Sequence, residues 1–292
     1  MARIVVLSDI HLSPTHGFFW ENWCVARDLA NRMKADAVIV NGDLAINGPD
    51  SDAEIDFAAS ALSHLQGPVM VLPGNHDVGD EPPGQDPNQI VNPSRLARWE
   101  RSFGADRWVM DMGGWSLIGV NAQLFGSGLV REHAQDDWLD EQLRAAKARR
   151  VGLFLHKPLF LEDPNDNVAG PRCIVPLARA RLLQKLQQSQ VRLIVSGHLH
   201  QHRDRTLDGM RHIWVPAVAF AASRPLGGDT RCGITVMEFS IDGVQIAVER
   251  PGGIVSHDLD AIKGYGRYQF LRDMPASPPP FPISDPRDLR NP

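Results

Sequence analysis

Short apolar runs alternate with longer amphipathic stretches along most of this 292-residue chain. Short runs rich in valine and isoleucine and bounded by polar residues are typical of buried strands. Such runs predict strands at 4–7, 37–40, 69–72, 108–110, 116–120, 151–155 and 193–195. Apolar residues at helical spacing predict helices at 22–34, 52–64, 134–149 and 176–188. This alternation of strands and helices favours a largely parallel sheet with crossover helices.

The pattern changes in the C-terminal third, where strand-like runs at 211–215, 233–239 and 244–249 follow one another without a helix. Asp242-Gly243 predicts a hairpin turn between the last two runs. We therefore expect this stretch to be antiparallel.

Two further segments differ in composition from the rest of the chain. Residues 79–93 are rich in glycine, proline, aspartate and asparagine, which is typical of a loop at the rim of a functional site. The tail at 273–292 is rich in proline and predicts an extended arm. We expect one domain at 1–272, followed by this arm, through which copies of the chain could form a homo-oligomer.

Composition narrows the function classes. Hydrophobic residues make up 43% of the chain and charged residues 22%, which are ordinary globular values. The net charge of −5 argues against a nucleic-acid partner, which usually requires a basic excess. The three cysteines match no zinc or redox spacing. With no apolar run long enough to span a membrane and no signal-peptide core, we expect a soluble, cytoplasmic protein.

Polar side chains that could bind metal follow five of the predicted strands. They are Asp9 and His11, Asp43, Asn75 and His76, His156, and His198 and His200. Because ligands gather at the carboxyl ends of parallel strands, we expect these residues to converge at one rim. Extended backbone at Asp9-x-His11 and His198-x-His200 would place both donors of each pair on one side.

The residue types also indicate which ions could bind. Carboxylate, amide oxygen and neutral imidazole suit iron, manganese, zinc or cobalt. Seven ligands exceed one tetrahedral site and suit two ions bridged by a carboxylate. Taken alone, Gly42-Asp43 is an ordinary turn and His156 an ordinary packed histidine. The joint pattern, in order and at strand ends, indicates a metal site.

The series Asp9-Ile10-His11, Gly42-Asp43, Gly74-Asn75-His76-Asp77, His156 and Gly197-His198-Leu199-His200 resembles the motif set of calcineurin-like metallophosphoesterases. The resemblance implies an α/β fold, a four-layer α/β/β/α sandwich with a dinuclear metal site at the C-terminal ends of the strands. It implies one ion on Asp9, His11, Asp43 and His200. It implies a second ion on Asp43, Asn75, His156 and His198, with Asp43 as the bridge.

The resemblance also implies a phosphoester hydrolase that uses a metal-bridging hydroxide. His76 is the candidate catalytic residue, for leaving-group protonation or a transition-state hydrogen bond. Asp77 could orient His76 or could be a simple turn residue.

Within the family, the motifs are similar to class III cyclic-nucleotide phosphodiesterases and to glycerophosphodiesterases, which favours a small phosphodiester as substrate. A phosphomonoesterase or nuclease on the same site is the alternative, and a non-catalytic metal-binding scaffold is a remote one. The sequence departs from the usual His-His-Pro at His156-Lys157-Pro158, where we expect Lys157 to point to solvent. The aromatic residues at 16–23 could form a substrate wall or pack on the core.

Overall fold

The computed structural model describes residues 1–258, which form two β-sheets packed face to face. The first sheet has the order β12-β11-β1-β2-β3. Its strands are β1 (Ala2–Leu7), β2 (Ala37–Asn41), β3 (Val69–Leu72), β11 (Ile234–Phe239) and β12 (Val244–Glu249). The second sheet has the order β4-β5-β6-β7-β9-β8. Its strands are β4 (Trp108–Met112), β5 (Trp115–Val120), β6 (Arg150–Leu155), β7 (Val191–Ser196), β8 (Arg203–Leu207) and β9 (Met210–Trp214).

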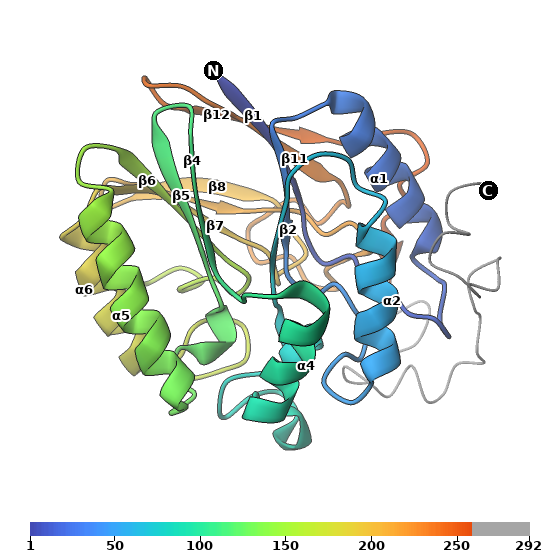
Figure 1. The fold of residues 1–292 in the computed structure, drawn as a ribbon, viewed down its shortest axis with the longest axis horizontal. Coiled ribbons are helices and arrows are strands. Elements are labelled where there is room, and N and C mark those ends of the chain that lie inside the picture. The colour runs from blue at the N-terminus through green and yellow to red at the C-terminus, as the bar shows by residue number, and fades with distance from the viewer. Residues whose placement is uncertain (259–292) are drawn as a thin grey trace.

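Helices cover the outer face of each sheet (Figure 1). On the first sheet these are α1 (Trp20–Met33) and α2 (Asp52–Leu62), with α4 (Pro93–Phe103) beside α2. On the second sheet they are α5 (Val130–Ala145) and α6 (Pro176–Gln187). Shorter elements are α3 (Asn75–Val78), the 3-10 turns Pro87–Gln89 and Ala122–Leu124, and the strand pair β10 (Phe220–Ala221) and β13 (His257–Asp258).

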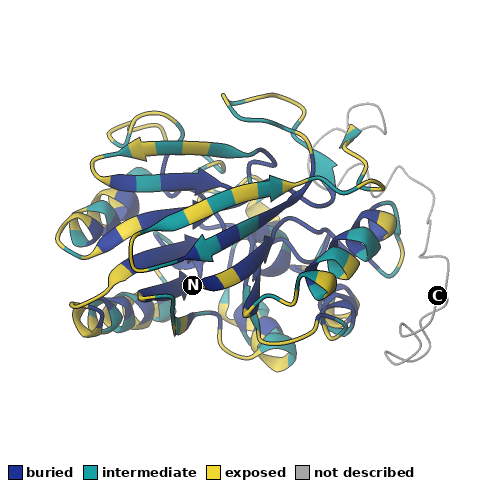
Figure 2. Ribbon diagram, turned by 90° about the horizontal axis from the view of Figure 1, so that it is seen from above, coloured by how far each residue is buried: buried dark blue, intermediate teal, exposed yellow. Residues whose placement is uncertain are grey.

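Three apolar cores hold these layers together. Alternate residues of β1 serve different cores: Ile4 and Val6 face the second sheet, whereas Val5 and Leu7 face the helices. A third core lies between the second sheet and α5 and α6. Figure 2 shows the sheets as mostly buried and the outward faces of the helices as exposed. The expected four-layer α/β/β/α sandwich is confirmed.

The central strands β1, β2 and β3 are parallel, as are β5, β6, β7 and β9. The hairpin between β11 and β12 is present and antiparallel. The antiparallel expectation for residues 211–215 holds on one side only, because β9 pairs antiparallel with β8 but in parallel with β7. The crossover that this requires contains β8, which pairs antiparallel to β9.

Two elements of five or more residues were missing from the sequence prediction, β8 and α4. The strand β8 reads Arg-Asp-Arg-Thr-Leu and carries no apolar run. The helix α4 follows the glycine- and proline-rich segment 79–93, but it has clear start signals. The Asn92 side chain accepts a hydrogen bond from the Arg95 amide at 3.0 Å, and Pro93 occupies the first turn. The arm predicted at 273–292, and the domain boundary before it, lie outside the described residues.

Candidate metal centre

The carboxyl ends of β1, β2, β3, β6 and β7 meet at one edge, where the two sheets contribute loops to a common site. Two groups of candidate donors form there. One donor atom from each of Asp9, His11, Asp43 and His200 lies within 4.8 Å of the others. A second group, built by the same criterion, contains Asp43, His156 and His198. The shared residue is Asp43, and the cluster fits a dinuclear site.

The backbone at the site is unusual. Five candidate ligands have left-handed backbone: Asp9 (φ 54°), His11 (φ 45°), Asp43 (φ 53°), His198 (φ 68°) and His200 (φ 52°). The expected extended backbone at the two paired motifs was therefore wrong, and tight turns bring the donors together instead. Left-handed backbone at residues other than glycine is costly, and such strain clusters at functional sites.

Two motif glycines are required by close approach. A Cβ atom on Gly42 would collide with the ring of His156, and one on Gly74 would collide with the carboxylate of Asp43. These glycines therefore let loops from different strands come close enough for their donors to share an ion.

Backbone carbonyls fix the ring nitrogens of four histidines. A carbonyl can only accept, so the ring nitrogen facing it carries the proton, and in the neutral ring the other nitrogen keeps a lone pair for a metal or a proton. The pairs are His156 Nδ1 to Asn41 O at 2.8 Å, His198 Nε2 to Pro171 O at 2.8 Å, His200 Nδ1 to Phe220 O at 2.8 Å, and His76 Nδ1 to Ile46 O at 2.7 Å.

For His156 and His200, the remaining nitrogen faces a carboxylate. His156 Nε2 lies 3.2 Å from Asp43 Oδ2, and His200 Nε2 lies 3.2 Å from Asp9 Oδ1. The Nε2 atoms of His11 and His200 are only 3.3 Å apart. A buried set of two carboxylates and several imidazoles is the donor chemistry of a divalent transition metal, which binds the imidazoles in their neutral form.

Because these carboxylates and histidines are buried close together, each shifts the pKa of its neighbours. Although burial opposes charge on each group, Asp43 raises the pKa of His156 to about 9, and the neighbouring histidines lower the pKa of Asp9 and of Asp43. Burial, reinforced by Lys157, lowers the pKa of His198 to about 3. Neutral His198 is the form that can bind a metal.

The Gly-Asn-His-Asp motif lies at the start of α3, beside these groups. Asn75 is buried at 2% exposure. The His76 amide donates to Asp43 Oδ1 at 2.7 Å, and its ring packs edge-on against His11 with centroids 4.6 Å apart. Asp77 accepts from the amides of Leu44 and Ala45 at 2.9 Å and of Gly74 at 2.8 Å. Asp77 thus fastens the loop after β2, whereas a carbonyl orients His76.

A family model for calcineurin-like phosphoesterases matches residues 2–202. The chain belongs to the calcineurin-like phosphoesterase family. Serine/threonine-protein phosphatase CPPED1 of Danio rerio is 26% identical over 253 residues, which cover 81% of this chain and 73% of that protein. CPPED1 of Bos taurus is 29% identical over 173 residues, 56% of this chain and 50% of that protein.

A bacterial relative is named for a different activity from that of the CPPED1 phosphatases. The 3',5'-cyclic adenosine monophosphate phosphodiesterase CpdA of Escherichia coli (strain K12) is 25% identical over 231 residues, 74% of this chain and 75% of that protein. This calcineurin-like phosphoesterase also shares its fold with a dimetal phosphatase from Danio rerio, with a TM-score of 0.60, 16% identity and coverage of 87% and 97% of the two chains. A purple acid phosphatase from yellow lupin has a TM-score of 0.62 at 15% identity, covering 88% of this chain and 52% of that one.

Lys157 departs from the sequence expectation. Its side chain does not point to solvent but is fully buried, with its ammonium 3.0 Å from Asp80 and 2.6 Å from Glu81. Both carboxylates belong to segment 79–93, which no local sequence pattern connects with His156. Among residues 1–258, none of the helices of this calcineurin-like phosphoesterase has the length and apolarity needed to cross a bilayer.

Most of the aromatic segment 16–23 packs on the apolar cores, which is the second of the two alternatives. Phe19, Trp20 and Trp23 are buried in the apolar cores, whereas Phe18 is half-buried. Phe220 was not predicted as part of the site, yet its half-buried ring lies against His200 with centroids 4.1 Å apart and also against His11. A single phenylalanine with no motif around it gives no sequence signal that it lies beside the candidate ligands.

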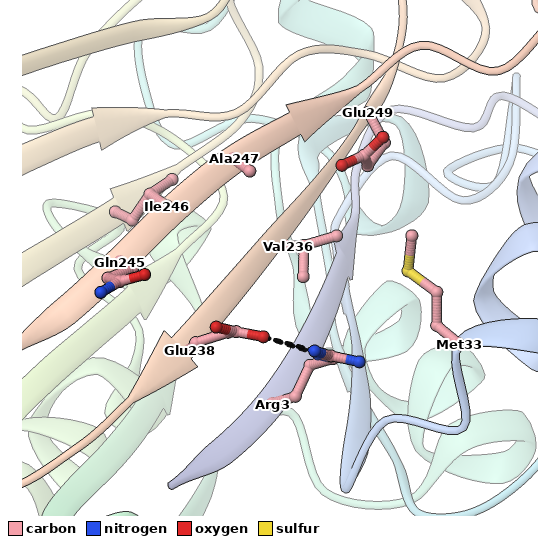
Figure 3. A pocket seen from close by; sticks show the side chains of 8 residues that line it. All are labelled: Arg3, Met33, Val236, Glu238, Gln245, Ile246, Ala247 and Glu249. Carbon is pink, nitrogen blue, oxygen red and sulfur yellow. Dashed lines mark hydrogen bonds and ion pairs between the residues drawn. The ribbon is translucent and has the colours of Figure 1, made fainter.

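A cavity of about 390 Å³ lies elsewhere, on the outer face of the first sheet (Figure 3). It is lined by β1, β11, β12 and the end of α1, and the ion pair between Arg3 and Glu238 spans it. None of the candidate ligands lines this cavity.

Proposed function

We propose that this metallophosphoesterase is a phosphodiesterase that acts on small diesters of the cyclic-nucleotide or glycerophosphodiester type. The observation that carries the proposal is the pair of donor groups sharing Asp43, with His76 beside them. The similarity to CpdA, a named cyclic-nucleotide phosphodiesterase, supports a diester substrate.

In this proposal Asp9, His11, Asp43 and His200 hold one ion, and Asp43, Asn75, His156 and His198 hold the other. The ions are iron, manganese, zinc or cobalt. When bound, such a pair lowers the pKa of water and offsets negative charge on phosphate oxygens. Asp43 Oδ1 accepts a hydrogen bond from the amide of His76, so this histidine lies beside the residue that the two donor groups share.

The role of His76 follows from its ring contacts. Its Nδ1–H donates to the carbonyl of Ile46, which leaves Nε2 to carry or release a second proton. We assign His76 to protonation of the leaving oxygen, or to a hydrogen bond with that oxygen in the transition state.

The charges near the site favour a diester over a monoester. A dianionic monoester calls for extra cations around the terminal phosphate. Lys157 is engaged by Asp80 and Glu81, and Arg231 is paired with Asp229 at 2.6 Å. A phosphomonoesterase or protein phosphatase is the second candidate, favoured by the similarity to CPPED1.

A side-by-side assay tests the proposal on the manganese-loaded enzyme. Bis-p-nitrophenyl phosphate and cyclic AMP should be hydrolysed faster than p-nitrophenyl phosphate, and chelation should abolish turnover. Faster monoester hydrolysis would favour the second candidate. Two bound Mn²⁺ without any turnover would favour a scaffold.

The variant His76→Ala tests the catalytic assignment. It should lower kcat by about 10²–10⁴-fold while leaving the manganese content unchanged. The exposed His133→Ala serves as the control and should have no effect on kcat. Loss of both ions in His76→Ala would contradict its role as a non-ligand.

A further inference from the structure

A buried ionic cluster lies next to the candidate metal centre. Lys157, Asp80 and Glu81 are exposed by 0%, 1% and 1%. The Lys157 ammonium donates to Asp80 Oδ1 at 3.0 Å and to Glu81 Oε2 at 2.6 Å. Lys157 directly follows His156 at the end of β6, so the cluster is attached to a candidate ligand.

The carboxylates belong to a segment that closes on itself. The Asp80 amide donates to the carbonyl of Gln89 at 2.9 Å, and the Val91 amide donates to the carbonyl of Asp80 at 2.7 Å. Asp80 Oδ2 also accepts from the Gln85 amide at 3.1 Å. Asp80 therefore joins the two ends of segment 79–91, so its contacts help to hold the segment in place. Arg95 holds the far end as well, by donating to the carbonyls of Asn88 and Ile90.

The same segment reaches the loop that carries Asp43. The Gln89 side chain donates to Asn47 Oδ1 at 3.0 Å, and Asn47 lies four residues after Asp43. One end of the segment is thus tied to the loop after β2 in the first sheet, and the other to β6 in the second sheet. The three candidate ligands Asp43, His156 and His198 come from the two sheets that this segment connects.

Stability alone does not account for the cluster. Replacing a buried ion pair by apolar side chains of similar volume is often neutral or stabilising, because desolvation offsets the Coulomb attraction. The Lys157 contacts are also hydrogen bonds, however, and hydrogen bonds are directional, so they favour one arrangement of the three side chains.

We infer that Lys157 is a positioning residue that acts through Glu81 and Asp80. It fixes segment 79–91 between the two sheets, and so keeps Asp43, His156 and His198 at the spacing that one cation requires. The inference rests on the dinuclear site of the proposed function. Groups behind metal ligands typically change metal affinity by about 10–100-fold when they are mutated.

Two substitutions of Glu81 show whether metal binding depends on the placement of segment 79–91 or on the charge of the Glu81 carboxylate. Glu81→Met removes the bond to Lys157 and leaves a balanced pair of Lys157 and Asp80, so the protein should fold. Glu81→Gln also removes the carboxylate, but its amide oxygen still accepts from Lys157. Chelator-treated proteins are titrated with Mn²⁺ by calorimetry, and exchange of the Val91 amide is followed by mass spectrometry.

We expect Glu81→Met to weaken one of the two Mn²⁺ sites by about tenfold or more and to speed exchange at Val91. Glu81→Gln should stay within about threefold of the wild type at both sites. The control is Lys185→Met, which breaks a more exposed cluster of one lysine with Asp136 and Asp140 between α5 and α6 and should change neither site.

Unchanged Mn²⁺ binding in Glu81→Met overturns the inference, even if its melting temperature falls. An equal loss in Glu81→Gln also overturns it, because charge rather than position would then be the cause. These outcomes leave the proposed function intact as long as the wild type binds two Mn²⁺. A wild type that binds none removes the proposed function, and the inference with it.

Discussion

Asn22 of α1 is hydrogen-bonded to residues 218 and 219, which lie beside Asp9 of the candidate metal centre. Replacing Asn22 tests how much these hydrogen bonds stabilise the fold. Its side chain is fully buried and donates to the carbonyls of Val218, Ala219 and Val255 at 2.8, 3.0 and 2.7 Å. Its Oδ1 accepts from the Val255 amide at 2.8 Å. The Ala219 amide in turn donates to the carbonyl of Asp9 at 3.0 Å.

The magnitude follows from these contacts. The two N–H groups of the amide are shared among three carbonyls, so the side chain makes about three full hydrogen bonds. At about 1 kcal/mol net each, Asn22→Ala should cost about 3 kcal/mol of unfolding free energy. Asn22→Asp should cost more, although it is nearly isosteric. It would turn a carboxylate oxygen toward three carbonyl oxygens and bury a charge without a partner.

Urea unfolding of the chelator-treated protein measures both effects. The exposed Asn88→Ala is the control and should change the unfolding free energy by less than about 0.5 kcal/mol. An Asn22→Asp variant at least as stable as Asn22→Ala at pH 7 would refute the reasoning, because it would mean that the three carbonyls do not need a donor.

Three further predictions concern charge, close approach and strain. Burial, reinforced by a nearby guanidinium, lowers the pKa of His212 from 6.5 to about 4. The unfolded chain binds more protons in that window, so stability should fall as the pH drops from 6.5 toward 4, and His212→Phe should flatten this slope in urea unfolding. Gly74→Ala should weaken Mn²⁺ binding by tenfold or more, as judged by calorimetry, whereas Gly170→Ala, whose added Cβ meets nothing within 4 Å, should not. In urea unfolding without metal, His11→Gly should be about 1 kcal/mol more stable than His11→Ala because of its left-handed backbone. At His156, which is not left-handed, alanine should be the more stable; the same sign at both positions would contradict the argument.

The sequence could predict most of the site because its signals are local. Asp43 lies two residues after the end of β2, and His156 directly follows the apolar run of β6. A polar residue at the end of a buried strand is placed by that strand, so its position needs no knowledge of distant contacts. The alternation of strands and helices is local in the same way, whereas the four-layer arrangement was implied by the resemblance to the family.

Other features could not be predicted because they depend on pairing at a distance. Lys157 pairs with carboxylates 76 and 77 residues away in the chain, and no local sequence pattern indicates these contacts. The parallel pairing of β9 depends on β8, whose charged sequence does not read as a strand. The histidine rings are oriented by backbone carbonyls, which every residue has, so a partner such as Pro171 cannot be recognised from its type.

The arrangement of the donors has a consequence for stability. Asp9 and Asp43 follow strands of the first sheet, whereas His156 and His198 follow strands of the second. An ion held by both sets would connect the two sheets, so metal binding and sheet packing contribute to a single equilibrium. The inter-sheet core, which includes Phe154, therefore sets the separation of the donors. The cores beneath the helices position only the outer layers, so a substitution there should change metal binding much less than one in the inter-sheet core.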